Sequence, residues 1–387
     1  MFYRYIILLL IFIITIKAFG FTNFSNPFFD DNFVVQRKKR GILKFKSNLW
    51  SEREIEFYIN DTLNYNTILY ALYLIRKETC LKFKQTYNPK KALFSYQPDK
   101  YYHTKLGKGI EIPHKIYVHI SVKNIKLIIR ETMRALGIDY EHNRPDRNRY
   151  VIINIFNINP FFFNFFEKRS SRTVDTYGFG YDYRSIMHFS SYEYSMKGRK
   201  TIESRDKLMI SSIGKSEIFT FNDIKLLNYK YCTFNNIPRI HCRHYGYPDP
   251  KLPTRCKCLP FMYGDLCQFR LENRGLCTHQ NSFLATPTIS TNTILVGGIC
   301  YFYIGSDNGG KIKLQIKYNN DSNIFYNNKE YHGIEVKYKS DLSVSGVYYP
   351  PTSIPLNIIS ETDMIVIQSK FTPQITKVSI SYREILQ

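Results

Sequence analysis

Residues 130–147, RETMRALGIDYEHNRPDR, contain the pattern on which the interpretation of the whole chain rests. The side chains that lead into and through its first half recur at the three-and-four spacing of an amphipathic helix with one inward stripe: Ile125, Ile128, Ile129, Thr132, Met133 and Leu136. Gly137 follows at the position where a left-handed residue commonly ends a helix. The stretch therefore predicts a helix that ends near Gly137 and leads into a polar segment.

A second motif, YDYRSIMHF, follows at residues 181–189. Together the two stretches resemble the astacin family of metalloproteases. Its signature is histidine, glutamate, two residues, histidine, two residues, glycine, two residues and histidine, and then a methionine-containing turn. The matching residues are Glu131, Ala135, Leu136, Gly137, Glu141, Arg144, Pro145, Asp146, Arg147, Ser185, Ile186, Met187 and His188. The resemblance implies an α+β fold: an astacin-like metzincin domain with a mixed sheet and two long helices, then a small disulfide-bonded EGF-like module and a β-sandwich CUB-like domain.

The sequence departs from the family at the metal site. Arg130, Arg134 and Tyr140 occupy the positions of the three histidine ligands, and Phe189 replaces the tyrosine that the family places two residues after its turn methionine. A zinc ligand needs a free lone pair at about 2.0–2.3 Å, whereas a guanidinium stays protonated and has none to offer. We therefore expect neither zinc, which the family binds, nor another cofactor.

Four other residues belong to the expected site. Glu131 stands where the family has its general base and is interpreted as vestigial, because a carboxylate alone lacks the acidity that a metal gives to its bound water. We expect one or both arginines to pair with Glu131 and Glu141 inside the former cleft, since buried charges need partners. The alternative is that the arginines and Lys126 form a solvated helix face. Gly137 and Met187 are expected to be scaffold, with Met187 in the core.

Eight cysteines, an even number, predict disulfides in a secreted chain. The family resemblance implies how they pair. Cys80 pairs with Cys232 in the first domain, Cys242 with Cys256 and Cys258 with Cys267 in a reduced EGF-like module, and Cys277 with Cys300 at the start of the CUB-like domain.

The first forty residues have the pattern of a processed leader. Residues 5–16, YIILLLIFIITI, give a secretory signal its apolar part and are shorter than the ~18–20 residues that span a bilayer, so we expect no membrane anchor. RKKR at 37–40 predicts cleavage that releases the pro-segment of a zymogen, the alternative being a solvated charge run. The expected organisation is a signal peptide at 1–20, a pro-segment at 21–40, an astacin-like peptidase domain at 41–232, a reduced EGF-like module at 233–268 and a CUB-like domain at 269–387.

Short periodic segments predict several further elements. Helical spacing predicts a helix through Ile68, Ala71, Leu72 and Ile75, with Asn66 as its start. Residues rich in β-branched and aromatic side chains predict strands at 55–60, 114–120, 364–368 and 378–382. Asn60 and Asn320 each begin a tripeptide that can accept a glycan, which would make the protein a glycoprotein.

The chain is strongly basic, with 54 Lys and Arg against 32 Asp and Glu, and a formal charge of +22. Such a surface can attract anionic glycans or acidic partners, although a general bias toward Asn, Ile, Lys, Tyr and Phe gives the same composition. We do not expect nucleic acid as a partner.

These observations favour a secreted, extracellular, catalytically inactive protease homologue that binds proteins or peptides in a substrate-like groove. One alternative is an active zinc endopeptidase that hydrolyses extracellular proteins with non-standard ligands, for which His142 and His188 are the nearest candidates; they lack the one-turn spacing that the motif supplies. The other is a basic protein that binds polyanionic glycans.

Overall fold

The computed structural model describes residues 41–45, 49–121, 123–216, 218–232, 240–319, 333–370 and 375–385. The expected signal peptide, pro-segment and the acceptor Asn320 lie outside these residues. Within them, no helix combines the length and the apolar composition needed to cross a bilayer.

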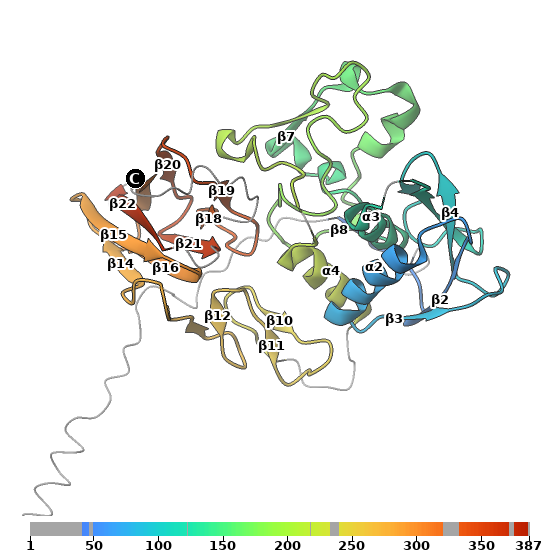
Figure 1. Ribbon diagram of the computed structural model, residues 1–387, viewed down its shortest axis with the longest axis horizontal. Helices are drawn as coiled ribbons and strands as arrows, with labels where there is room; N and C mark the ends of the chain where they lie inside the picture. Colours follow the sequence, from blue (N-terminus) through green and yellow to red (C-terminus); the bar gives the residue numbers. More distant parts are fainter. Residues whose placement is uncertain are drawn as a thin grey trace, which may run out of the picture. The chain divides into compact units, whose positions relative to one another are not determined.

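A mixed five-stranded sheet opens the first domain. Its strand order is β3-β2-β4-β6-β5, with β2 (Glu54–Ile59), β3 (Lys82–Gln85), β4 (Phe94–Asp99) and β6 (His114–His119) parallel and β5 (His103–Thr104) antiparallel at one edge. The expected strands at 55–60 and 114–120 coincide with β2 and β6. Figure 1 shows helices α2 (Tyr65–Glu78) and α3 (Ile125–Ala135) together on one side of this sheet. The sheet and helices confirm the predicted α+β class.

Asparagine side chains cap both helices. Asn64 accepts a hydrogen bond from the backbone N–H of Thr67 at 3.0 Å, so the cap of α2 lies two residues before the predicted Asn66. Asn124 caps α3 in the same way through the N–H of Leu127, at 3.2 Å. Gly137 has φ of +92°, and a Cβ there would lie 2.7 Å from the side chain of Leu49. Glycine is therefore required where α3 ends.

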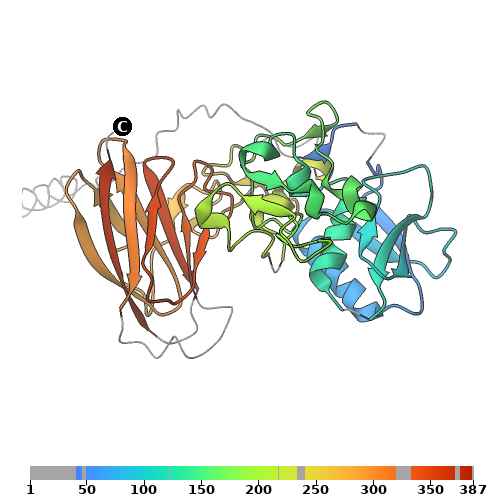
Figure 2. The ribbon, with the colours of Figure 1, turned by 90° about the horizontal axis from the view of Figure 1, so that it is seen from above.

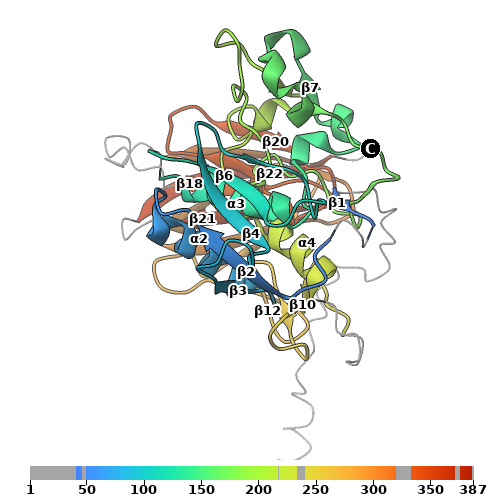
Figure 3. The same cartoon turned by 90° about the vertical axis from the view of Figure 1, so that its right-hand side faces the viewer.

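Short elements dominate the rest of this domain. β1 (Ile42–Leu43) pairs with β8 (Val174–Asp175), and β7 (Val151–Ile153) pairs with β9 (Ile202–Ser204). Short 3₁₀ helices precede β9, namely η2 (Glu141–Asn143), η3 (Arg147–Arg149), η4 (Ile155–Asn157) and η5 (Pro160–Phe166), and η6 (Lys207–Met209) follows it. Figure 3 shows the segments around β7 in green. Helix α4 (Phe221–Tyr231) closes the domain and begins with a capping box formed by Thr220 and Asp223.

Two small hairpins follow, β10 (Tyr247–Pro248) with β11 (Cys256–Lys257) and β12 (Met262–Tyr263) with β13 (Phe269–Arg270). The four disulfides join the pairs that the family resemblance implies: Cys80–Cys232, Cys242–Cys256, Cys258–Cys267 and Cys277–Cys300. Two of these disulfides, Cys242–Cys256 and Cys258–Cys267, cross-link the region of the two hairpins. Such cross-links stabilise a module whose hydrophobic core is small.

The last part of the chain is a β-sandwich, whose two sheets face each other in Figure 2. One sheet has the order β14-β16-β21-β18-β19 and the other β15-β22-β17-β20. The strands are β14 (Ser282–Ala285), β15 (Ser290–Val296), β16 (Ile299–Ser306), β17 (Lys311–Tyr318), β18 (Gly333–Lys337), β19 (Val347–Tyr349), β20 (Leu356–Ile359), β21 (Met364–Lys370) and β22 (Thr376–Ile385). Alternate residues of β17 are buried between the sheets, as expected for a sandwich. The predicted strands at 364–368 and 378–382 lie inside β21 and β22.

Candidate functional site

Four residues from three segments meet beside helix α3. The guanidinium carbon of Arg134 lies 4.1 Å from the ring centroid of Tyr140, and that ring lies 4.4 Å from the ring of Phe189. The guanidinium carbon of Arg130 is 5.2 Å from the same Phe189 ring. The structure therefore brings together the four positions at which the sequence departs from the astacin signature.

Arg130 is held by groups of the methionine-containing turn and the loop after it. Only 2% of the residue is exposed. Its Nε donates to the carbonyl of Ile186 at 2.9 Å, its Nη2 donates to the carbonyl of His188 at 3.2 Å, and its Nη1 donates to Oε1 of Glu193 at 2.5 Å. Because charge-assisted bonds to a buried guanidinium offset much of its desolvation, Glu193 is the counter-ion that this position needs.

Arg134 has a different counter-ion, Asp139. Its Nη1 donates to Oδ1 of Asp139, and its Nε donates to the carbonyl of Thr104 in β5 at 3.1 Å. Arg169 donates to the second oxygen of Asp139 at 2.6 Å. Burial alone would raise the pKa of Asp139, but the two guanidiniums outweigh it and lower that pKa below the usual value. Asp139 is therefore an anion that links the end of α3 to the segment containing Arg169.

The expected pairing of the arginines with Glu131 and Glu141 is wrong, because Glu193 and Asp139 form the ion pairs. Glu141 instead accepts from Arg144 at 3.0 Å and from the backbone N–H of Asp182 at 2.8 Å. The alternative of a solvated helix face is also wrong, since the sheet and the following turn cover α3 and leave Arg134 only 4% exposed.

Glu131 forms its hydrogen bonds with Tyr140. The phenol of Tyr140 donates to the two carboxylate oxygens of Glu131 at 3.1 and 3.3 Å. Burial raises the pKa of Glu131 to about 7, although Arg134 and Arg130 oppose that shift. Burial also raises the pKa of Tyr140 well above its usual value. The residue at the general-base position is thus a buried carboxyl group whose partner is a neutral phenol.

The methionine-containing turn is fixed from α4. Asp223 accepts from the hydroxyl of Ser185 at 2.5 Å and from the N–H of Ile186 at 3.0 Å. Met187 is buried, and its carbonyl accepts from the N–H of Glu141 at 3.0 Å. These bonds hold the turn against the segment that follows α3.

The side chains at the site do not fit zinc. The guanidiniums have no lone pair, and the Tyr140 phenol is engaged with Glu131. Within the part of the chain that the structure describes, no three His, Cys, Asp or Glu side chains are placed to hold a metal ion together. The side chains at the signature positions therefore do not form a set of ligands for Zn²⁺.

His142 and His188 lie close together, with ring centroids 5.7 Å apart. His188 bonds Tyr181 at 2.6 Å through Nε2 and the carbonyl of Phe189 at 2.6 Å through Nδ1. Nε2 of His142 is 3.1 Å from the carbonyl of Phe165. Burial lowers the pKa of both imidazoles, that of His188 to about 3. Two neutral rings with these partners fall short of the three protein ligands that a catalytic zinc site uses.

Sequence reasoning missed Glu193, Asp139 and Arg169. Asp139 lies next to Tyr140 and carries a local signal, because an acid within five residues of Arg134 can reach it across the end of the helix. Glu193 lies 63 residues after Arg130, and no local pattern indicates that contact.

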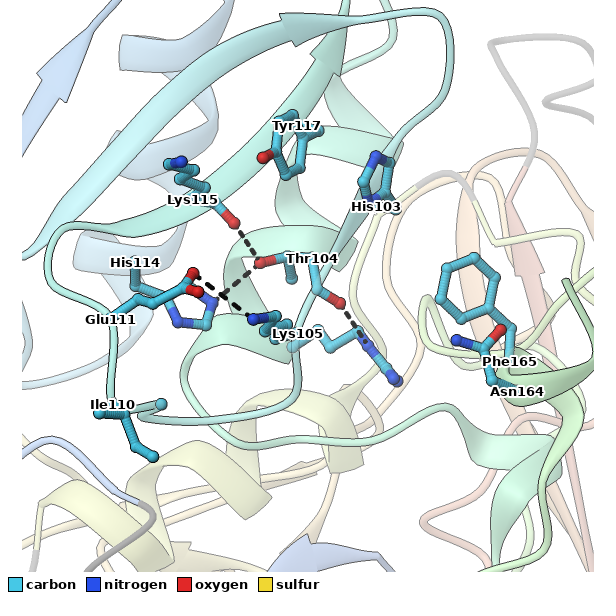
Figure 4. Close-up of a pocket in the computed structure, with 12 residues that line it drawn as sticks. His103, Thr104, Lys105, Ile110, Glu111, His114, Lys115, Tyr117, Asn164 and Phe165 are labelled. Carbon is cyan, nitrogen blue, oxygen red and sulfur yellow. Dashed lines mark hydrogen bonds and ion pairs between the residues drawn. The ribbon is translucent and has the colours of Figure 1, made fainter. Parts of the chain in front are cut away.

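A pocket of about 540 Å³ opens beside this site, and Arg134 forms part of its wall. Figure 4 shows Thr104 of β5 among the residues that line the pocket, with Lys105 and Lys115 nearby. Lys105 is 3.4 Å from Glu111, and the hydroxyl of Thr104 donates to the carbonyl of Lys115 at 2.7 Å. The pocket lies at the edge strand of the sheet, and its lining holds more cationic than anionic side chains.

The fold and these signature positions define a protein with the architecture of a metalloprotease. The family model for the astacin peptidases matches residues 42–232. The chain therefore belongs to the astacin family through this domain.

The chain is similar to three known proteins. Zinc metalloproteinase nas-34 of Caenorhabditis elegans is 28% identical over 339 residues, which cover 86% of this chain and 55% of the relative. The chain thus spans about half the length of the curated relatives it matches first. The solved structure of high choriolytic enzyme 1, a hatching enzyme zinc-protease from Oryzias latipes, is 25% identical, covers 50% of this chain and 98% of that chain, and has a TM-score of 0.42. The CUB1-EGF-CUB2 domain of human MASP-1/3 is 16% identical, covers 38% of this chain and 55% of that chain, and has a TM-score of 0.21.

Proposed function

We propose that this protein is a non-catalytic member of the astacin family that binds proteins or peptides in the cleft of its former protease domain. The observation that carries the proposal is that Arg130 and Arg134 fill two ligand positions and hold their own buried counter-ions, Glu193 and Asp139. We infer that the protein is secreted, with a signal peptide at 1–20 and a pro-segment ending at 40, and that its EGF-like and CUB-like modules follow the protease-like domain.

Charge balance supports stability without the metal. Zinc with three neutral histidines carries two positive charges, and Arg130 with Arg134 carries the same two. Each guanidinium has a carboxylate partner and at least one backbone carbonyl. A buried charge with partners of this kind can be tolerated, whereas an unpaired one is strongly destabilising.

The pocket supports a binding role. Strand β5 is at the edge of its sheet, so its outer side can pair with an extended peptide through main-chain hydrogen bonds. Lys105 and Lys115 are exposed there, and both line the pocket. We infer that the bound segment is extended and contains an acidic side chain.

The first test of this proposal is hydrolysis of casein or gelatin by the protein lacking residues 1–40, in the presence of added zinc. We expect no cleavage above that of the Glu131→Gln variant, because neither protein has a metal to activate water. Cleavage by the wild type that a chelator and Glu131→Gln both abolish would support the alternative of an active endopeptidase.

Peptide binding provides the second test. Hydrogen exchange at β5 is expected to slow when an acidic peptide binds, and Lys105→Glu with Lys115→Glu is expected to remove this effect. Lys82→Glu, on β3 at the opposite edge of the same sheet, is the matched control. Equal protection in all three proteins would contradict binding in the pocket. Equal loss in the control would instead indicate a diffuse polyanion-binding surface.

A further inference from the structure

Helix η5 has aromatic side chains on two opposite sides. On the inner side, the ring of Phe162 lies 4.2 Å from that of Tyr194, and Phe166 is buried. On the outer side, Phe161 is 89% exposed and Phe163 is 42% exposed. The inner aromatic residues anchor the helix, so the outer ones are held in solvent by a fixed backbone and are not side chains of a loose loop.

The neighbouring segments add further exposed apolar side chains. In the preceding helix η4, Phe156 is 92% exposed. Backbone hydrogen bonds join this region to the segment 192–200: the N–H of Met196 donates to the carbonyl of Asn157, and the N–H of Asn159 donates to the carbonyl of Tyr194, both at 2.9 Å. We call the exposed side chains of these paired segments the apolar tip. They are Ile155, Phe156, Phe161, Phe163, Tyr192 and Met196.

Cationic side chains lie beside the apolar tip. Lys197 and Arg199 are exposed and Lys200 is half-buried, and the amide of Asn157 donates to the carbonyl of Lys200 at 2.8 Å. Within the described ranges, none of these three cations forms an ion pair with a carboxylate.

The acidic residues of the same region have other partners. Glu193 binds Arg130, Glu167 accepts from Arg169 at 3.2 Å, and Glu203 accepts from the amide of Asn154 at 2.7 Å. The surface around the tip is therefore apolar at its most exposed points and cationic at its border.

We propose that the apolar tip docks this protein on an anionic lipid bilayer. Exposed aromatic side chains can enter the boundary between headgroups and acyl chains, while bordering Lys and Arg bind lipid phosphates. A polyanionic glycan would use the cations but would leave the aromatic side chains in water. A protein partner would need a broad, continuous contact area, whereas Asn157, Asn159 and Asn164 interrupt the aromatic residues here. This inference does not depend on the state of the arginine site.

Co-sedimentation with vesicles tests the proposal. The protein used lacks residues 1–40, and the vesicles consist of phosphatidylcholine with or without phosphatidylserine. The wild type is expected to sediment with the anionic vesicles and much less with neutral ones. Phe156→Ser with Phe161→Ser is expected to weaken binding at least tenfold. Lys197→Glu with Arg199→Glu is expected to weaken it by roughly 20- to 30-fold or more, from the usual contribution of each cation near an anionic surface.

Matched controls are Tyr87→Ser and Tyr70→Ser, which remove exposed apolar side chains elsewhere in the same domain and should leave sedimentation unchanged. Near-ultraviolet circular dichroism of each variant establishes that it is folded. Absence of wild-type binding to anionic vesicles would overturn the proposal. So would unchanged binding after the two phenylalanine substitutions, because the surface would then act through charge alone.

Discussion

The guanidinium of Arg134 lies over the ring of Tyr140, with 4.1 Å between its Cζ and the ring centroid. These residues stand at the second and third ligand positions of the astacin signature, so each takes the place of a zinc ligand of the family. Cation–π contact is strongest when both groups are removed from water, as they are here. The replacements thus form a packed cluster and do not leave a vacated pocket.

The first prediction concerns the buried ion pair of Arg134 with Asp139. Arg134→Met is expected to lower the free energy of unfolding by about 3–5 kcal/mol, because it leaves the Asp139 carboxylate with one guanidinium instead of two. Urea denaturation measures this change. The control is Lys84→Met, which removes an exposed pair with Glu56 at 3.0 Å and should change the free energy of unfolding much less, because water screens an exposed ion pair. Equal effects of the two substitutions would contradict the account of the buried pair.

The second prediction concerns the pH dependence contributed by Glu131. Burial raises its folded-state pKa to about 7 from the usual value of 4.5, so the folded state retains the proton more strongly than the unfolded chain. The contribution of this group to stability is fully present below pH 4.5 and is lost as the pH rises toward 7. The size of the loss is on the order of 3 kcal/mol.

Glu131→Gln isolates this contribution, because glutamine does not titrate while Asp223, whose pKa burial raises to about 6, still does. Relative to Glu131→Gln, the wild type is expected to lose stability between pH 4.5 and pH 7 in urea titrations. A constant difference between the two proteins across that range would show that Glu131 is ionised throughout.

The third prediction compares two disulfides. Cys80–Cys232 links residues 152 apart, whereas Cys242–Cys256 links residues 14 apart. In the chain-entropy account, replacing both cysteines of a pair by alanine costs roughly 5 kcal/mol for the long loop and roughly 3 kcal/mol for the short one. Because Cys242–Cys256 lies outside residues 41–232, thermal unfolding of the first domain should shift markedly for the first pair and little for the second. The reverse order would contradict the assignment of Cys80–Cys232 as the main cross-link of that domain.

Local sequence patterns predicted the elements whose stability is local. The period of apolar residues placed α3, and β-branched runs placed β2, β6, β21 and β22. The start of α2 was misplaced at Asn66, since the residue whose side chain caps the helix is Asn64. The 3₁₀ helices η4 and η5 have no periodic signal, since their side chains pack on segments far away in the chain.

The sequence predicted where the site lies, but the predicted ion-pair partners of the two arginines were wrong. Family resemblance located Arg130, Arg134, Tyr140 and Phe189, and the structure brings all four together. The family resemblance did not indicate Glu193 as a counter-ion, because that contact depends on how the loop after the methionine-containing turn folds back over α3. Buried charges predict that counter-ions exist, but tertiary structure decides which carboxylates serve.

Permanently cationic side chains, Arg130 and Arg134, stand at two of the three ligand positions of the signature. Elemental analysis of the purified protein, after dialysis against a zinc buffer, directly measures the zinc bound per chain. We expect far less than one zinc for the wild type and an increase toward one in the Arg130→His, Arg134→His, Tyr140→His variant. One tightly held zinc per wild-type chain, located beside α3 by anomalous scattering, would contradict this expectation.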